Sequence, residues 1–254
     1  MKITLFILSI FLGFSAFSQT NTNITIRAKA KDAKFIGTSI GGAMIIVRNA
    51  DNGTILAQGM AEGSTGNTNK IMRESKDRYT QISDEASAKF VAELKLNKPQ
   101  FITIEVISPY ANRQAQILAS TQIWAIPGKH IDGDGIIIEI PGFIIDILDP
   151  HTHRFISKED LPKGELKVRA NIVMMCGCTI SDGGLWDGSD MEVKAMVYQK
   201  DQLVGTYPME ITDTVNIFEG IIPMTQTGPI EIIVYAYDAK TSNTGVDKVN
   251  FVID

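Results

Sequence analysis

Hydrophobic and polar residues alternate with a period of two along much of this chain. The alternation is clearest at residues 24–30, 90–96, 166–174 and 191–197. Successive side chains of a β-strand point to opposite faces of its sheet, so this period predicts strands with one buried face. No long segment keeps the 3.6-residue period of an amphipathic helix. We expect one short helix, at 83–89.

Short apolar runs rich in β-branched residues lie between the alternating segments, at 44–47, 102–107, 136–140, 143–148 and 230–234. They are typical of strands that are more fully buried. Glycine, asparagine and aspartate separate the runs, and we expect Asp132-Gly133-Asp134-Gly135 to form a tight turn between strands. Many short strands with frequent turns predict an all-β chain built of β-sandwiches.

The chain is long enough for two domains in tandem. Residues 149–164 contain two prolines and many charged residues between two strand-rich blocks, which is the composition of a linker. We therefore expect an N-terminal β-sandwich domain at 19–148, a linker at 149–164 and a C-terminal β-sandwich domain at 165–254.

The first 18 residues have the composition of a signal peptide. Lys2 precedes an apolar run at 3–14, and the small residues Ala16 and Ser18 lie before the expected cleavage site. The apolar run is shorter than the ~20 residues that a transmembrane helix needs. We expect a periplasmic or secreted protein with no integral membrane segment after cleavage.

Two segments resemble known sandwich families. Residues 230–238, ending in Ala-Tyr-Asp, are followed by an Asn-rich turn and a closing strand at 248–253, and this ending resembles bacterial immunoglobulin-like domains. Residues 42–59 are similar to the first hairpin of transthyretin-like or carboxypeptidase-regulatory-like sandwiches. The first resemblance implies an immunoglobulin-like C-terminal domain. Both imply a module for adhesion, spacing or binding.

Charge and motifs exclude some classes of function. The chain has 24 basic and 29 acidic residues and no basic block, so we expect no nucleic-acid partner. It contains no Gly-x-Ser-x-Gly elbow, no phosphate-binding glycine loop, no His-Glu-x-x-His and no Cys-x-x-Cys. We expect that the protein is not an enzyme.

Cys176 and Cys178 are the two cysteines of the chain. If the strand at 166–174 continues through them, Met174, Cys176 and Cys178 share one face, with the cysteine Cα atoms roughly 6.6 Å apart. That distance is near the upper limit of disulfide geometry, unless Gly177 bends the chain. Three interpretations remain open: a local disulfide favoured by an oxidising compartment, a soft-metal site, or inert core.

The metal interpretation points to copper. Two thiolates and a thioether are ligands that Cu(I) prefers, so Met174, Met175, Cys176 and Cys178 are candidate ligands. His151 and His153 could add imidazoles if the linker folds back. Trp186, in a loop of glycines and aspartates, either packs over the end of the sandwich or contacts a partner.

These observations predict an exported two-domain β-sandwich protein for binding or interaction. In the more specific version of this hypothesis, the protein binds copper at the Met-Met-Cys-Gly-Cys segment. In the alternative form it is a structural or adhesive module that presents loops to a protein or glycan, and its Cys-Gly-Cys is a local disulfide. A thiol-disulfide exchange protein is the third form, for which no nearby positive residue is evident in the sequence.

Overall fold

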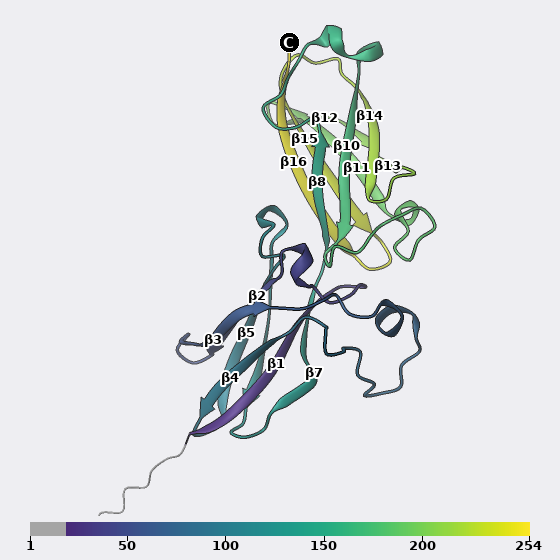
Figure 1. Cartoon of the computed structure of the whole chain (residues 1–254). Coiled ribbons are helices and arrows are strands. Elements are labelled where there is room, and N and C mark those ends of the chain that lie inside the picture. The colour runs from purple at the N-terminus through teal and green to yellow at the C-terminus, as the bar shows by residue number, and fades with distance from the viewer. Residues whose placement is uncertain (1–18) are drawn as a thin grey trace, which may run out of the picture.

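The alternating segments of the sequence form strands in the computed structural model, which describes residues 19–254. The chain folds into two β-sandwiches that lie end to end (Figure 1). The prediction of an all-β chain of sandwiches is confirmed. The predicted signal peptide at 1–18 lies outside the described residues. Within 19–254, no helix is long and apolar enough to cross a membrane.

The first sandwich packs a three-stranded sheet against a four-stranded sheet. In the order β4-β1-β7, β1 (Thr20–Ala30) is antiparallel to β4 (Phe90–Leu96) and parallel to β7 (Ile131–Ile140). The other sheet has the order β3-β2-β5-β6 and is antiparallel, with strands β2 (Ala43–Asn49), β3 (Ile55–Ala61), β5 (Gln100–Ser108) and β6 (Ile117–Ala125). Alternate residues of β5 are buried between the sheets, and in β1 all residues from Ile24 to Ala28 are buried.

A long loop between β3 and β4 covers one end of this sandwich. Its helical turn, η2 (Asn69–Arg73), buries Ile71. The helix expected at 83–89 is wrong, because these residues pair with the start of the loop through isolated bridges, Glu62 with Lys89 and Ser64 with Ser87. The hydroxyl of Ser87 also donates to the Asp84 carboxylate (2.6 Å), which stabilises a turn in place of a helix.

Arg27 and Asp134 attach this loop to the sheets. The buried Arg27 guanidinium donates to the carbonyls of Ser87 (2.6 Å), Ala88 (2.9 Å) and Gly133 (3.2 Å). The Asp134 carboxylate accepts from the backbone N–H groups of Ile82 (2.9 Å) and Ser83 (2.8 Å). Residues 132–135 were expected to form a tight turn. They instead belong to β7, where the register against β1 shifts between Ile24 and Ile26.

The second sandwich has the strand order of an immunoglobulin-like fold. One sheet has the order β13-β14-β10-β8 and the other β12-β11-β15-β16-β9. In chain order the strands correspond to A, A′, B, C, C′, D, E, F and G, which gives the A-B-E-D sheet of that fold and its C′-C-F-G sheet with A′ added beside G. Their bounds are β8 (Phe143–Asp149), β9 (Phe155–Ile156), β10 (Glu165–Met174), β11 (Glu192–Gln199), β12 (Gln202–Pro208), β13 (Glu210–Ile211), β14 (Ile217–Pro223), β15 (Gly228–Asp238) and β16 (Asn243–Ile253).

The two hairpins that suggested family resemblances are present. β15 and β16 pair in antiparallel register over their whole length, and β2 pairs with β3 around the turn at Asp51–Gly53. The immunoglobulin-like arrangement of the second sandwich follows from its strand order. The narrower assignments to bacterial immunoglobulin-like and transthyretin-like families stay predictions.

Strand pairing at 143–164 differs from the expected domain limits. β8, which we assigned to the first domain, pairs with β10, for example Ile145 with Ile172. The expected linker contains β9, which pairs with β16, and the short turns η4 (Lys158–Asp160) and η5 (Pro162–Gly164). This polar segment connects β8, in one sheet of the second sandwich, to β9, in the other sheet. The connection between the two sandwiches is instead Pro141-Gly142, between β7 and β8.

Candidate functional site

The chain turns sharply at the two cysteines. β10 ends at Met174, whose carbonyl accepts from the Gly177 N–H (2.7 Å) and whose N–H donates to the Cys178 carbonyl (3.2 Å). Gly177 has a φ of 74°, a conformation that glycine adopts without steric cost. The Cα atoms of Cys176 and Cys178 lie 5.3 Å apart, and their sulfurs form a disulfide. The strand therefore does not continue through the cysteines, and the bend at Gly177 that we considered brings their Cα atoms within the range of disulfide geometry.

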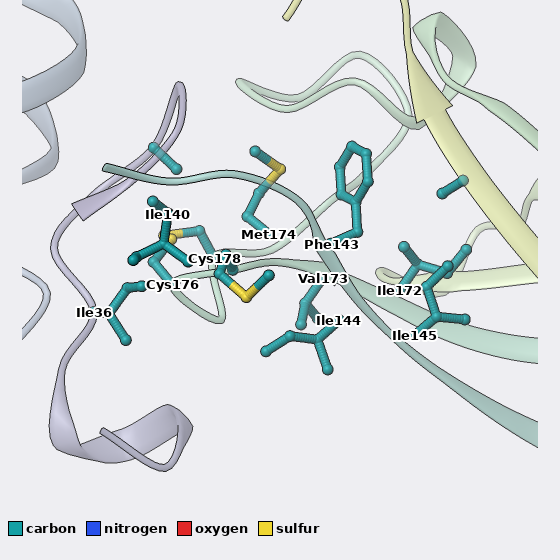
Figure 2. Packing of buried hydrophobic residues seen from close by; sticks show 14 of the residues in the cluster. Ile36, Ile140, Phe143, Ile144, Ile145, Ile172, Val173, Met174, Cys176 and Cys178 are labelled. Atoms are coloured by element: carbon teal, nitrogen blue, oxygen red, sulfur yellow. A yellow bond between two sulfur atoms is a disulfide. The ribbon is translucent and has the colours of Figure 1, made fainter. Parts of the chain in front are cut away.

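The disulfide lies at the junction of the two sandwiches. Figure 2 shows it beside Ile36 and Ile140 of the first sandwich, with Met174 and Phe143 of the second sandwich nearby. A Cβ built on Gly177 would lie 3.0 Å from Cδ1 of Ile40, so the turn packs directly against the first sandwich. Met174, Met175 and Cys176 are each 1% exposed. The segment is thus a buried part of the domain junction.

Trp186 is also a junction residue. It lies in the loop between β10 and β11, is 9% exposed and belongs to the hydrophobic core. Its indole N–H donates to the carbonyl of Asp32 in the first sandwich (2.8 Å). Of the two roles considered for Trp186, the structure shows packing, and its contact is within the chain.

Asn243 is a further residue of the domain junction. It is completely buried, and its side-chain oxygen accepts from the N–H of Gly142 (2.8 Å). Its side-chain nitrogen donates to the carbonyl of Lys31 (3.2 Å). One amide therefore satisfies polar backbone groups of the interdomain connection and of the first sandwich. The sequence suggested only that this asparagine begins a turn.

A cavity of about 390 Å³ opens beside the disulfide. The second sandwich contributes Cys176 to Thr179, Leu185 and Trp186. The first contributes two cationic side chains, Lys34 and Arg73, and three hydroxyl-bearing residues, Ser39, Thr65 and Thr68. The sequence separates these residues by more than a hundred positions, so only the docking of the two sandwiches brings them together.

The candidate histidines do not join this site. β8 runs from Phe143, which pairs with Met174 beside the cysteines, to Asp149, which pairs with Arg169. His151 and His153 follow the far end of β8, and the N–H of His153 donates to the carbonyl of Asn250 (2.8 Å). A strand length therefore separates both histidines from the cysteines. The mixed sulfur and nitrogen site that we considered is not formed.

The sulfur groups are not arranged as a metal site in this structure. Cys176 and Cys178 are bonded to each other, so neither offers a free thiolate. Within residues 19–254, no group of three or more His, Cys, Asp or Glu residues is placed to hold a metal ion. Of the three interpretations of the Cys-Gly-Cys segment, the structure agrees with the local disulfide.

A second feature, which sequence reasoning missed, is an aromatic pair on the open face of sheet β3-β2-β5-β6. Trp124 of β6 is 61% exposed, and its ring lies 5.1 Å from that of Phe101 between centroids. Gln122 donates to the Thr103 hydroxyl (3.0 Å), and Arg48 pairs with Glu105 (2.9 Å). Burial alternates along β6 and places Trp124 on the exposed face of the strand, but the sequence at 117–125 shows too little hydrophobic alternation to have indicated this.

No protein-family model and no curated protein sequence matches the chain. Solved structures match at low similarity. An engineered protein is 13% identical, with a TM-score of 0.33, over 48% of this chain and 22% of its own length. The fibronectin(III)-like modules of Clostridium thermocellum CbhA are 10% identical, with a TM-score of 0.30, over 92% of this chain and 94% of theirs.

The titin domains Z1Z2, in a complex with telethonin, are 5% identical, with a TM-score of 0.25, over 93% of this chain and 98% of theirs. The chain spans about a fifth of the engineered protein and nearly all of the two modular structures. At these TM-scores the likenesses assign neither a family nor a function, and the description of the fold rests on the strand order of this chain.

Proposed function

We propose that this chain is an exported, non-catalytic interaction protein that binds a protein or glycan partner through the face centred on Trp124. The exposed Trp124 ring is the observation that carries the proposal. Tryptophan is enriched among the residues that dominate binding energy, and a large apolar ring facing solvent gains most when a partner covers it.

The surroundings of Trp124 suit a binding surface. Phe101 supports the ring from the adjacent strand, so the tryptophan loses little conformational freedom when it is covered. Around the pair lie an amide, a hydroxyl and a charge pair, all on the same face of the sheet. Leu118, 63% exposed, lies farther along β6 on the same face, beyond Ser120 and Gln122.

Export is part of this proposal, because the composition of 1–18 supports a signal peptide and a disulfide is stable in an oxidising compartment. The periplasm or the exterior of the cell is the proposed location.

We expect Trp124→Ala to abolish partner binding. Purified protein would be tested on a glycan array and, after immobilisation, against proteins from the surface of the producing cells, with quantification by mass spectrometry. Tyr79→Ala is the matched control, because Tyr79 is an exposed aromatic residue on the loop between β3 and β4, away from the β6 strand. A partner retained equally by the wild type and by Trp124→Ala would contradict the proposal.

Copper binding through Met174, Met175, Cys176 and Cys178 stays a prediction that applies to the reduced chain. Reduction would free two thiolates next to two buried thioethers, a donor set that suits Cu(I). Elemental mass spectrometry of protein purified with and without reductant tests it. Copper near one equivalent in the reduced sample, lost in the Cys176→Ser, Cys178→Ser variant, is the expected result. Metal-free reduced protein would contradict it.

A further inference from the structure

We propose that the cavity between the two sandwiches is a binding site for a small molecule that carries a carboxylate or phosphate group. This site is separate from the Trp124 face, and it goes beyond the proposed interaction function. Its volume of about 390 Å³ lies within the range typical of small-molecule sites.

The charges that line the cavity have one sign. Lys34 and Arg73 are its charged residues, and none of the described residues lining it is acidic. Within 19–254, neither cation forms an ion pair. Arg73 donates one hydrogen bond to the side chain of Asn69 (3.1 Å), which leaves most of its N–H groups for a ligand.

Acidic residues gather on the other side of Leu185 and Trp186. A smaller hollow there is lined by Asp32, Asp187, Asp190 and Asp238, and Lys240 pairs with Asp190 (2.6 Å). The two side chains shared by both hollows therefore divide a negative side from a positive side. An anion is favoured only on the positive side, where Lys34 and Arg73 are placed to make charge-assisted hydrogen bonds with its oxygens.

The remaining lining adds hydroxyl donors and an apolar wall. Thr65 and Thr68 lie on the same loop as Arg73 and can donate to an oxyanion. Trp186, Leu185 and the disulfide form the wall contributed by the second sandwich. A ligand with an oxyanion at one end and a small ring or apolar group at the other would match both parts.

The segments around the cavity are held in place without a ligand. Phe35, next to Lys34, is buried, and its N–H donates to the Thr65 carbonyl (3.2 Å). Ile71 is buried beneath the turn that ends at Arg73. On the other side the disulfide closes the Cys176–Cys178 turn, and the Asp32 carbonyl holds the Trp186 indole. Binding would therefore require little rearrangement of the backbone.

Trp186 provides a direct readout. The chain has two tryptophans, so Trp124→Phe leaves Trp186 as the single tryptophan reporter. In this background, fluorescence would be titrated at constant ionic strength with benzoate, phenyl phosphate, inorganic phosphate and uncharged benzamide. We expect a saturable change with benzoate, phenyl phosphate or both, and none with benzamide. The preferred anion would distinguish a carboxylate ligand from a phosphate ligand.

Charge-removing variants test the assignment of residues. Lys34→Gln and Arg73→Gln should each weaken anion binding by about tenfold or more, because each removes a charge-assisted hydrogen bond. Lys98→Gln is the matched control, since Lys98 is exposed and follows β4 at the opposite end of the first sandwich. It should leave binding unchanged within about twofold, as expected for a charge beyond the screening distance. Thermal unfolding would establish that each variant folds.

Two results would overturn the proposal: no saturable response to any of the three anions, or equal responses to benzoate and benzamide. An equal effect of Lys98→Gln and Lys34→Gln would also overturn it, because the response would then follow net charge. None of these results bears on partner binding at Trp124, which is measured with other ligands and another variant.

Discussion

At the scale of single residues, buried polar groups decide how the two sandwiches meet. Asn243 has no exposed surface, and both ends of its amide are used, one by the N–H of Gly142 and one by the carbonyl of Lys31. A buried polar group without a hydrogen-bond partner costs far more than the net gain from a bond that is made. The hydrogen-bonding groups of the Asn243 side chain therefore contribute more to the stability of the junction than the volume that the side chain fills.

Asn243→Ala should lower the free energy of unfolding by about 2–4 kcal/mol, because two buried backbone groups lose their partner. Urea denaturation measures it. Asn250→Ala is the control, since Asn250 lies on the same strand with an exposed side chain, and it should change stability by less than about 0.5 kcal/mol. Equal effects of the two variants would show that the Asn243 amide is not needed at the junction.

The cysteines give a second prediction at this scale. The disulfide closes a loop of only three residues, so breaking it should cost only about 1–2 kcal/mol of stability in the chain-entropy model. The Cys176→Ser, Cys178→Ser variant should fold, unfold at slightly lower urea and keep partner binding. Alkylation of the unreduced wild type should label no thiol. Two labelled thiols in protein purified without reductant would contradict the disulfide.

At the scale of elements, two charged side chains, Arg27 and Asp134, hold the loop between β3 and β4 against the sheets. Burial raises the pKa of Asp134, but hydrogen bonds from Ser83 and Ile82 and the charge of Arg27 outweigh it and hold the pKa below its ordinary value. The ionised carboxylate is thus stabilised in the folded state. Its contribution is fully present above the unfolded pKa of about 3.9, and it is lost as pH falls through the lower folded pKa.

Asp134→Asn should therefore destabilise the protein at pH 7, by about 1 kcal/mol after allowance for solvent screening. The variant should also lose part of the decrease in stability that the wild type shows below about pH 4. Urea denaturation at pH 7 and pH 3 measures both effects. Asp132→Asn, two residues away on the exposed surface, should behave like the wild type. The same pH profile for Asp134→Asn and wild type would refute the role of the carboxylate.

At the scale of the whole molecule, the second sandwich begins earlier than its composition suggests. β8 and β9 supply one edge strand to each of its sheets, and both lie before residue 165. Without them, the buried residues on β10 and β16 would be exposed, and both sheets would lose an edge of paired backbone groups. A fragment should fold only if it contains them.

We expect residues 141–254 to unfold cooperatively as an isolated fragment and residues 165–254 to be unfolded or much less stable. Circular dichroism during thermal denaturation distinguishes the two outcomes. Equal midpoints for both fragments would mean that β8 and β9 are dispensable, and that the second sandwich begins near the limit we predicted from composition.

The strands with strong alternation, such as β4 and β10, could be recognised in the sequence because one face of each strand meets a core and most of the other face meets water. β6 and β12 were missed for a physical reason. The inward face of β6 includes alanine and threonine, and β12 is an edge strand with little buried surface. In both cases the difference in hydrophobicity between the two faces is too small to show in the pattern.

The site around Cys176 and Cys178 could be predicted only in part from the sequence. Local chemistry was sufficient to single out the Met174–Cys178 segment, because two cysteines one residue apart are unusual wherever they fold. Their pairing depended on the bend at Gly177. The separation of His151 and His153 from the cysteines depended on the pairing of β8 with β10. The burial of Trp186 and the placement of Lys34 and Arg73 beside the disulfide depended on how the two sandwiches dock. Periodicity reports which face of a strand is buried, but it does not report which distant surface buries it. The alternation along the chain was therefore enough to establish a β-sandwich protein, and only the packing of one sandwich against the other created its cavity and junction.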